Sequence, residues 1–212
     1  MVYIPSHFAE PRPEVLADFI RDHNFGILIS AAAEGVIASH IPFLYDAERG
    51  PHGTLWGHLA RGNPQLKELG AGREALAIFE GPHGYITPRW YATHPAVPTW
   101  NYSVVHAYGT VEPIEEVGEL ERLVARLADH HEAGAASPWR LADQPEKYRQ
   151  GMLRGISGFA IRLTRLEGKF KLSQNRDPTD RARVIAGLRA EGNVELADLM
   201  AKRESEKAAP VS

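Results

Sequence analysis

The chain has 212 residues, enough for one large domain or two small ones with a substantial core that needs no disulfide or metal. It contains no cysteine, which excludes disulfide scaffolds, Cys-ligated metal clusters and a cysteine nucleophile, and agrees with the cytoplasmic location that we expect. The formal net charge of −3 disfavours general attraction to nucleic acid, whose affinity comes mainly from phosphate neutralisation. The sequence has no basic and apolar leader and no run of 18 apolar residues, so we expect neither a signal peptide nor a membrane span.

The hydrophobic pattern predicts strands joined by short turns, with helices between and after them. Apolar or alternating runs typical of strands occupy residues 25–31, 36–46, 54–60, 74–82, 84–91 (the start of a fifth element), 101–113 and 155–173. Helical spacing or helix-start signals occupy residues 13–24, 61–72, 115–132, the end of 134–148, and two pieces within 178–207. Short turns between strands favour an antiparallel sheet or barrel. No G-x-G-x-x-G or Walker loop is present, which argues against Rossmann and P-loop folds.

A strand-to-helix junction, "GHLARGNPQL" at 57–66, is the strongest local signal for a binding site. Asn63 is a candidate N-cap, and Pro64 suits the first turn of a helix. The start of a helix attracts anions, and Arg61 adds a planar fork of donors suited to phosphate. The alternative interpretation is a plain turn with a solvated arginine.

A second signal is the proline in "SHIPF" (39–43), because proline within a strand is confined to edges and bulges. The freed backbone groups of such a strand could hydrogen bond a flat heterocycle. An ordinary edge strand explains the same pattern.

Two further segments combine polar and aromatic side chains at strand ends. Between His83 and Tyr102, prolines stiffen a loop rich in aromatic residues, which forms either a binding wall or a packed interface. In "KFKLSQNR" (169–176), Lys169 and Lys171 point the same way on a strand and are followed by Gln174. A solvated basic strand end is the alternative here.

The remaining candidates are weaker. The pattern His130-His131-Glu132 does not match a zinc helix, and we expect no metal site, although His40 and His58 on neighbouring strands are alternative metal or haem ligands. No G-x-S-x-G elbow is present. The C-terminal helices resemble a helix-turn-helix in outline, but carboxylates occupy the end that would read DNA. Phosphates repel carboxylates, so two amphipathic helices docked on the body are favoured over a DNA reader.

Five motifs in order, "YIPSHF", "GHLARGNPQ", "YITPRWY", "VPTWNYSVVHAYG" and "KFKLSQNR", resemble the PaiB family of FMN-binding negative transcriptional regulators. The resemblance covers nearly the whole chain. It implies an α+β, mainly β fold, the antiparallel FMN-binding split β-barrel of pyridoxamine 5'-phosphate oxidases, with peripheral helices and a C-terminal helical pair. It also implies a split-barrel domain over 1–177, a helical extension over 178–212, and a homodimer with flavin bound between the subunits.

The same resemblance implies which residues hold FMN. Arg61 and Asn63 would meet the phosphate with His58 beside them, and Ser39, His40 and Ile41 would lie along the isoalloxazine. The partner subunit would contribute Trp100, Asn101, Tyr102, Lys171 and Gln174. No catalytic acid or base is identified, and DNA is a further candidate partner. Two alternative functions remain: a flavin-dependent oxidoreductase acting on a small molecule, and a haem-binding split barrel.

Overall fold

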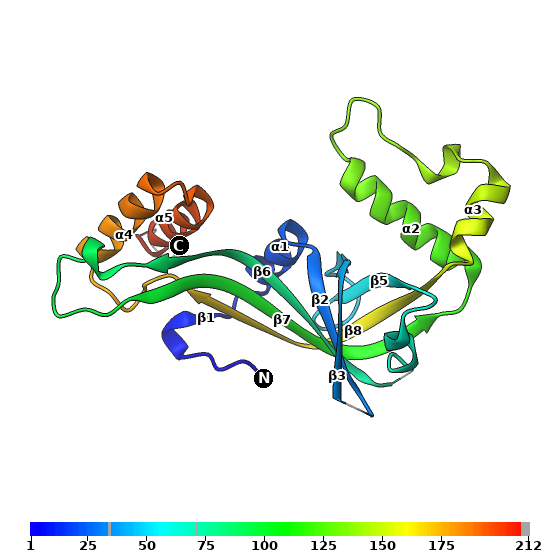
Figure 1. The fold of residues 1–212 in the computed structure, drawn as a ribbon, viewed down its shortest axis with the longest axis horizontal. Coiled ribbons are helices and arrows are strands. Elements are labelled where there is room, and N and C mark those ends of the chain that lie inside the picture. The colour runs from blue at the N-terminus through cyan, green and yellow to red at the C-terminus, as the bar shows by residue number, and fades with distance from the viewer. Residues whose placement is uncertain (34, 71, 209–212) are drawn as a thin grey trace. The chain divides into compact units, whose positions relative to one another are not determined.

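A computed structural model describes residues 1–33, 35–70 and 72–208 of the chain (Figure 1). The residues group into two compact units. The central unit comprises Pro13–Phe79 and His106–Leu166. The terminal unit comprises Met1–Arg12, Glu80–Val105 and Glu167–Ser212.

Eight strands form one sheet in the order β3-β2-β6-β7-β8-β5-β4, and β1 pairs with β8. The strands are β1 (Ala9–Glu10), β2 (Phe25–Ala32), β3 (Gly35–Pro42), β4 (Leu44–Asp46), β5 (Thr54–Ala60), β6 (Glu74–Ile86), β7 (Thr99–Ile114) and β8 (Ile156–Lys171). The pairs with assigned registers are antiparallel, including the hairpin of β2 and β3. The order is an open path with β3 and β4 at its ends, and it confirms the predicted antiparallel sheet.

Within the described residues, five α-helices accompany the sheet, and their positions agree with the helical spacing of the sequence. They are α1 (Pro13–Asp22), α2 (Val117–Glu132), α3 (Glu146–Leu153), α4 (Pro178–Ala190) and α5 (Val194–Ala208). Short 3-10 turns occur at η1 (Ser6–Phe8), η2 (Pro64–Lys67), η3 (Pro88–Trp90) and η4 (Leu141–Asp143). No helix in the described part of the chain is long and apolar enough to cross a membrane.

The helix expected over 61–72 was wrong in extent. Only the four residues Pro64–Lys67 form a turn, and it is a 3-10 turn. Glycines at 70 and 72 end the segment, and Gly72 has a φ of 79°, which helical residues do not adopt.

The strand expected over 36–46 is interrupted at Phe43. The backbone N–H of Phe43 donates to the carbonyl of Asn24 at 2.8 Å, in register with the β2–β3 pairing that ends at Phe25 and Pro42. The ring of Phe43 is buried in the core, where its centroid lies 5.5 Å from that of Phe79. Burial of a large aromatic ring stabilises this position between β3 and β4.

Residues 74–91 form one long strand followed by a 3-10 turn, where the sequence indicated two separate elements. The pattern ended one strand at residue 82 and began the next element at 84, but β6 continues through Gly84 to Ile86. A Cβ on Gly84 would lie 2.7 Å from Nδ2 of Asn193 and 3.1 Å from Cδ2 of Leu196, so the absence of a side chain at Gly84 lets the C-terminal helices pack closely against the strand.

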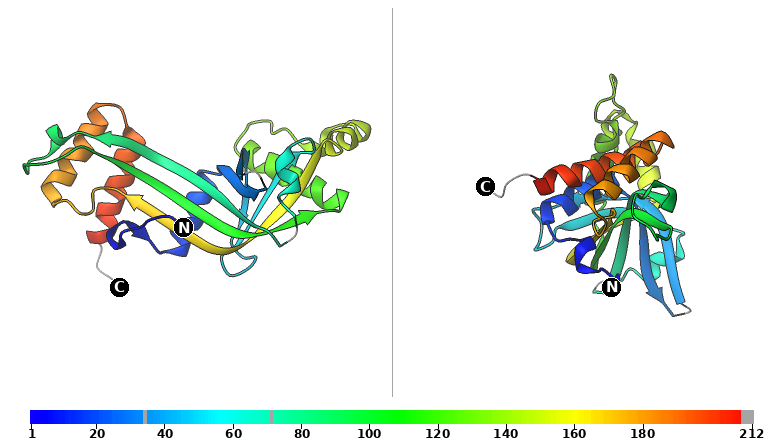
Figure 2. Two further views of the ribbon diagram at one scale, coloured as in Figure 1. Left: turned by 60° about the horizontal axis from the view of Figure 1, so that its bottom comes forward. Right: turned by 90° about the vertical axis from the view of Figure 1, so that its left-hand side faces the viewer.

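Helices α4 and α5 lie side by side in the terminal unit (Figure 2). Asn193, between them, donates from Nδ2 to the carbonyl of His83 on β6 at 3.0 Å. The carboxylate of Asp180 is buried and accepts from the backbone N–H of Ala92 at 2.6 Å. The predicted docking of both helices on the strands is therefore observed within this unit.

The core of the central unit is apolar and is covered on one side by α2. A buried cluster joins the helix to the strands and consists of Leu44, Trp56, Leu123, Leu127 and Ala160.

In the same unit, β7 and β8 approach closely at Gly109, where an added Cβ would lie 2.3 Å from the carbonyl oxygen of Arg162.

Replacing Gly109 with alanine is expected to lower the free energy of unfolding by about 1–3 kcal/mol, because the methyl group meets rigid backbone. Urea denaturation measures the change. Gly151→Ala is the matched control, since nothing lies within 4 Å of its added Cβ and α3 gains a better helix former. Equal effects of the two substitutions would contradict the close approach.

Candidate functional site

The junction after β5 brings two of the predicted residues into contact. The side-chain oxygen of Asn63 accepts from the backbone N–H of Gln65 at 2.9 Å and so caps the turn Pro64–Lys67, as predicted. Its Nδ2 donates to Oγ of Ser39 on β3 at 3.0 Å. Asn63 and Ser39, which are 24 residues apart, therefore form one polar pair in the central unit.

Arg61 is exposed, but its guanidinium is held by backbone carbonyls. Nε donates to the oxygen of Arg154 and Nη2 to the oxygen of Ile156, both at 3.0 Å. Nη1 makes no hydrogen bond to the residues that the structure describes, so one edge of the fork remains open to an anion. The short turn after Arg61 has too few aligned peptide dipoles to attract an anion as a full helix would, which corrects the expected helix-terminus site.

Gln65 organises this junction, although the sequence did not single it out. Its side chain is wholly buried. Nε2 lies 3.1 Å from the oxygen of Leu28 and from Oγ of Ser30, and 3.2 Å from the oxygen of Ile37. The only sequence signal was its place directly after the Asn-Pro helix-start pair.

His58 lies on β5 and is mostly buried. Burial lowers its pKa, because the charged imidazolium loses hydration without gaining a counter-charge. Its Nδ1 is enclosed and has no hydrogen-bond partner among the described residues. A neutral imidazole with an unsatisfied nitrogen is suited to a ligand or an ordered water. No group of three or more potential metal-ligating side chains occurs among the residues described.

The predicted residues on β3 face opposite sides of the strand. Ser39 is half-buried and Ile41 is buried, while His40 between them is exposed. Side chains alternate along a strand, so a ligand on one face of β3 contacts the side chain of His40, and a ligand on the other face contacts those of Ser39 and Ile41. Ile41 lies at Gly57 on β5, where its Cδ1 would be 3.2 Å from an added Cβ.

In the terminal unit, Trp100, Asn101 and Tyr102 likewise alternate along β7. Trp100 is 54% exposed and Tyr102 half-buried, whereas Asn101 is completely buried. Nδ2 of Asn101 donates to Oγ of Ser173 at 2.9 Å and lies 3.4 Å from the sulfur of Met200. Asn101 thus joins β7, the end of β8 and α5. Its effect on any ligand acts through the positions of its two aromatic neighbours.

These aromatic neighbours border a groove of about 270 Å³. The ring of Tyr85 meets that of Trp100 edge-on at 6.1 Å, and His83 lies 6.4 Å from the same ring. The groove is lined by Glu80, Gly81, His83, Trp100, Tyr102, Ser103 and Val104. The aromatic segment identified in the sequence therefore lines a groove.

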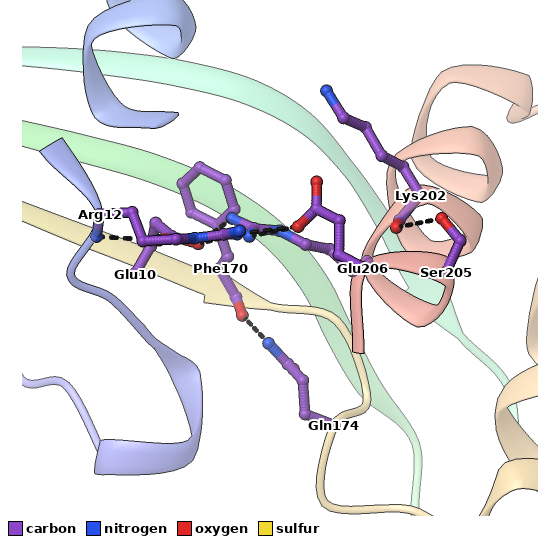
Figure 3. A network of polar contacts seen from close by, with 8 residues as sticks. Glu10, Arg12, Phe170, Gln174, Lys202, Ser205 and Glu206 are labelled. Atoms are coloured by element: carbon purple, nitrogen blue, oxygen red, sulfur yellow. Dashed lines mark hydrogen bonds and ion pairs between the residues drawn. The ribbon is translucent and has the colours of Figure 1, made fainter. Parts of the chain in front are cut away.

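The other two predicted residues lie at the end of β8. Nζ of Lys171 donates to Oγ1 of Thr99 and, at 2.6 Å, to the carbonyl of Trp100. Gln174 uses its amide locally, accepting from the N–H of Leu172 at 2.6 Å and donating to the carbonyl of Phe170 (Figure 3). The amide of Gln174 is therefore occupied by the backbone.

A charged network lies beside Gln174 (Figure 3). Nε of Arg12 lies 2.9 Å from Oε1 of Glu10, and Nη2 of Arg12 lies 2.8 Å from Oε2 of Glu206. Arg203 pairs with the same two carboxylates. The pKa of Arg12 is raised, chiefly by its hydrogen bond to Glu10. This network joins β1 to α5 and leaves no charge unpaired.

The sequence-predicted residues thus fall into two groups. The central unit holds Ser39, His40, Ile41, His58, Arg61 and Asn63, and the terminal unit holds Trp100, Asn101, Tyr102, Lys171 and Gln174. Direct contact is seen for the pair Ser39–Asn63 in the first group.

Comparisons with known proteins agree with this architecture. Residues 2–165 match the model of the family described as "Putative FMN-binding domain". The protease synthase and sporulation protein PAI 2 of Bacillus subtilis is 34% identical, over 94% of this chain and 96% of its own length. An uncharacterized protein of Aspergillus fumigatus is 36% identical, over 88% of this chain and 90% of its own.

Two solved structures share the fold at low sequence identity. The flavocytochrome Anf3 of Azotobacter vinelandii superposes with a TM-score of 0.61 at 11% identity, over 85% of this chain and 78% of its own. The FAD and heme binding protein of Mycobacterium smegmatis gives 0.60 at 17% identity, over 82% of this chain and 78% of its own. The predicted split-barrel class is confirmed. With the family match, the identity to PAI 2 and the open antiparallel sheet, the chain belongs to the PaiB family of FMN-binding-domain proteins.

Proposed function

We propose that the protein binds FMN as a homodimer and acts as a negative transcriptional regulator of the PaiB type. The observation that carries the proposal is the junction of the central unit. There the open edge of the Arg61 guanidinium and the Ser39–Asn63 pair offer donors for a phosphate. The family match over residues 2–165 includes this whole junction.

The donor set suits the phosphate end of the flavin, and neighbouring groups suit its ring. The enclosed Nδ1 of the neutral His58 can form a hydrogen bond with the polar edge of the flavin ring. The edge strand β3 offers backbone N–H and C=O groups beside Ile41 to the same ring. In this proposal the partner subunit supplies Trp100, Tyr102 and Lys171 to the flavin, while its Asn101 and Gln174, whose amides are bound to protein atoms, support these residues structurally. When bound, FMN supplies its redox-active ring system, while Trp100, Tyr102 and Lys171 bind and orient it.

Titration with FMN tests the cofactor. One FMN per chain is expected to bind with quenching of flavin fluorescence, and Arg61→Ala is expected to weaken FMN binding by roughly ten- to hundredfold, as for one lost charged hydrogen bond. Riboflavin is the control ligand, because it lacks the phosphate, and its affinity is expected to change little.

Equal losses for both ligands would place Arg61 away from the phosphate. Absence of quenching with the unmodified protein would refute the cofactor, and a haem absorption band in the purified protein would favour the haem-binding alternative. Thermal melting of Arg61→Ala controls for the lost bonds to Arg154 and Ile156.

The proposed dimer and the role of Asn101 are tested together. Asn101→Ala removes the bond to Ser173 and is expected to weaken FMN binding, because Trp100 and Tyr102 lose their common anchor. Light scattering is expected to give the mass of a dimer for both proteins. Ser173→Ala, which removes the same bond from the other side, is expected to have the same effect. A monomeric mass for the unmodified protein at micromolar concentration would count against a shared site.

The regulatory role rests on the resemblance to PaiB and requires DNA binding to be measured. At the start of α5 the described charges include Glu195 and Asp198, and Asp198 pairs with Arg189 at 2.8 Å. A gel-shift assay over a salt series is expected to show a retarded DNA band that weakens steeply as salt rises. No band at the lowest salt concentration would remove direct DNA binding while leaving the flavin proposal intact.

A further inference from the structure

Lys169 is a buried cation without an anionic partner. It lies on β8 in the terminal unit and is only 9% exposed. Its Nζ makes no ion pair or hydrogen bond with any residue that the structure describes. It lies instead over two aromatic rings, 5.4 Å from the centroid of Tyr102 and 5.5 Å from that of Tyr3. Such cation–π contacts offset part of the cost of dehydrating an ammonium group.

Lys171, two residues further along, adds a second cation on the same face of the strand. Its Nζ is bound by two neutral acceptors, Thr99 and the carbonyl of Trp100, and lies 5.9 Å from the ring of Phe8. Its pKa is lowered, first by burial and second by the charge of Lys169. Burial and the neighbouring charge of Lys169 both disfavour the charged form of Lys171.

The nearby carboxylate of Glu167 lies on the same face but is directed to the N-terminal segment. Its Oε2 accepts from the backbone N–H of Val2 at 3.0 Å. The same segment carries Tyr3 and Phe8, whose rings lie at the two ammonium groups. The lysine pair is therefore enclosed by aromatic rings, and neither lysine pairs with a carboxylate of the described chain.

The groove beside Trp100 indicates the size of a ligand. Tyr102 both lines this groove and lies over Lys169. The groove's volume of about 270 Å³ is below the range of roughly 300–1,000 Å³ typical of pockets for drug-sized ligands. A single aromatic ring suits it better than a complete flavin.

We propose that Lys169 and Lys171 form an oxyanion-binding site for a small aromatic molecule that carries a phosphate or carboxylate. The anion neutralises the buried charge of Lys169 and the half-buried charge of Lys171, neither of which pairs with a carboxylate of the described chain, and the ring packs along Tyr102 and Trp100. The oxyanion belongs to a separate small aromatic ligand, because the phosphate of FMN is assigned to Arg61 and Asn63 and the groove suits a single ring. The site shares Lys171, Trp100 and Tyr102 with the proposed FMN site, but binding of the small anion does not require FMN.

Calorimetric titration of the full-length protein tests the site with phenyl phosphate and benzoate as probes and with benzyl alcohol as the neutral control. The anionic probes are expected to bind, and benzyl alcohol is not. Lys169→Met and Lys171→Met are each expected to weaken phenyl phosphate binding by roughly ten- to hundredfold, as for a lost charged hydrogen bond. Lys202→Met, which removes an exposed charge from α5, is the matched control and is expected to bind as the unmodified protein does.

Thermal melting separates this role from a structural one. Without ligand, Lys169→Met is expected to melt at the same or a higher temperature, because an unpaired buried charge is replaced by an apolar side chain. Phenyl phosphate is expected to raise the melting temperature of the unmodified protein and of Lys202→Met, but not of Lys169→Met. Absence of phenyl phosphate binding at millimolar concentration, or equal binding by all variants, would overturn the proposal.

Competition with FMN distinguishes a separate ligand from the flavin phosphate. Equal affinity of Lys169→Met and the unmodified protein for FMN, with loss of phenyl phosphate binding, supports a separate ligand. Loss in Lys169→Met of affinity for FMN but not for riboflavin would overturn the separate ligand and would place the FMN phosphate at the lysines instead of at Arg61. If FMN fails to bind at all, the phenyl phosphate titration still decides the oxyanion site.

Discussion

The buried amide of Gln65 holds together the strands on which the candidate junction depends. Its Nε2 contacts carbonyl oxygens of Leu28 on β2 and Ile37 on β3. A buried carbonyl without a partner costs about 1–3 kcal/mol, so these contacts resist any shift of the turn relative to the two strands. Asn63, two residues before Gln65, is consequently held where it meets Ser39. The donors proposed for a phosphate therefore stand on a fixed turn.

Polar groups of the terminal unit divide into two kinds. The amides of Asn101 and Gln174 are bound to protein atoms, so they support the structure around the groove. Lys169 and Lys171 have aromatic or neutral partners, and their charges remain uncompensated within the described chain. In the proposed binding by this unit, recognition accordingly depends more on its cations and aromatic rings than on its amides.

Local hydrophobic patterns predicted most of the strands and helices. They failed where contacts with distant segments accompany a different course of the backbone. Alternation located β5 over Thr54–Ala60 and helical spacing located α2. The break at Phe43 was missed, and the ring of Phe43 packs against Phe79, which is remote in sequence. The pattern also divided residues 74–91 near Gly84, yet Gly84 is a strand residue against which α5 packs.

The sequence by itself determined the antiparallel sheet, the helices beside it, the exclusion of cysteine chemistry and the motifs shared with the PaiB family. These properties follow from residue type and short-range spacing, which a linear chain displays directly. Only the tertiary structure decided which of the chemically suitable side chains are free to act. Arg61 keeps an open edge, Asn101 is enclosed and Lys169 is buried without an anion, because each depends on segments that are distant in the sequence.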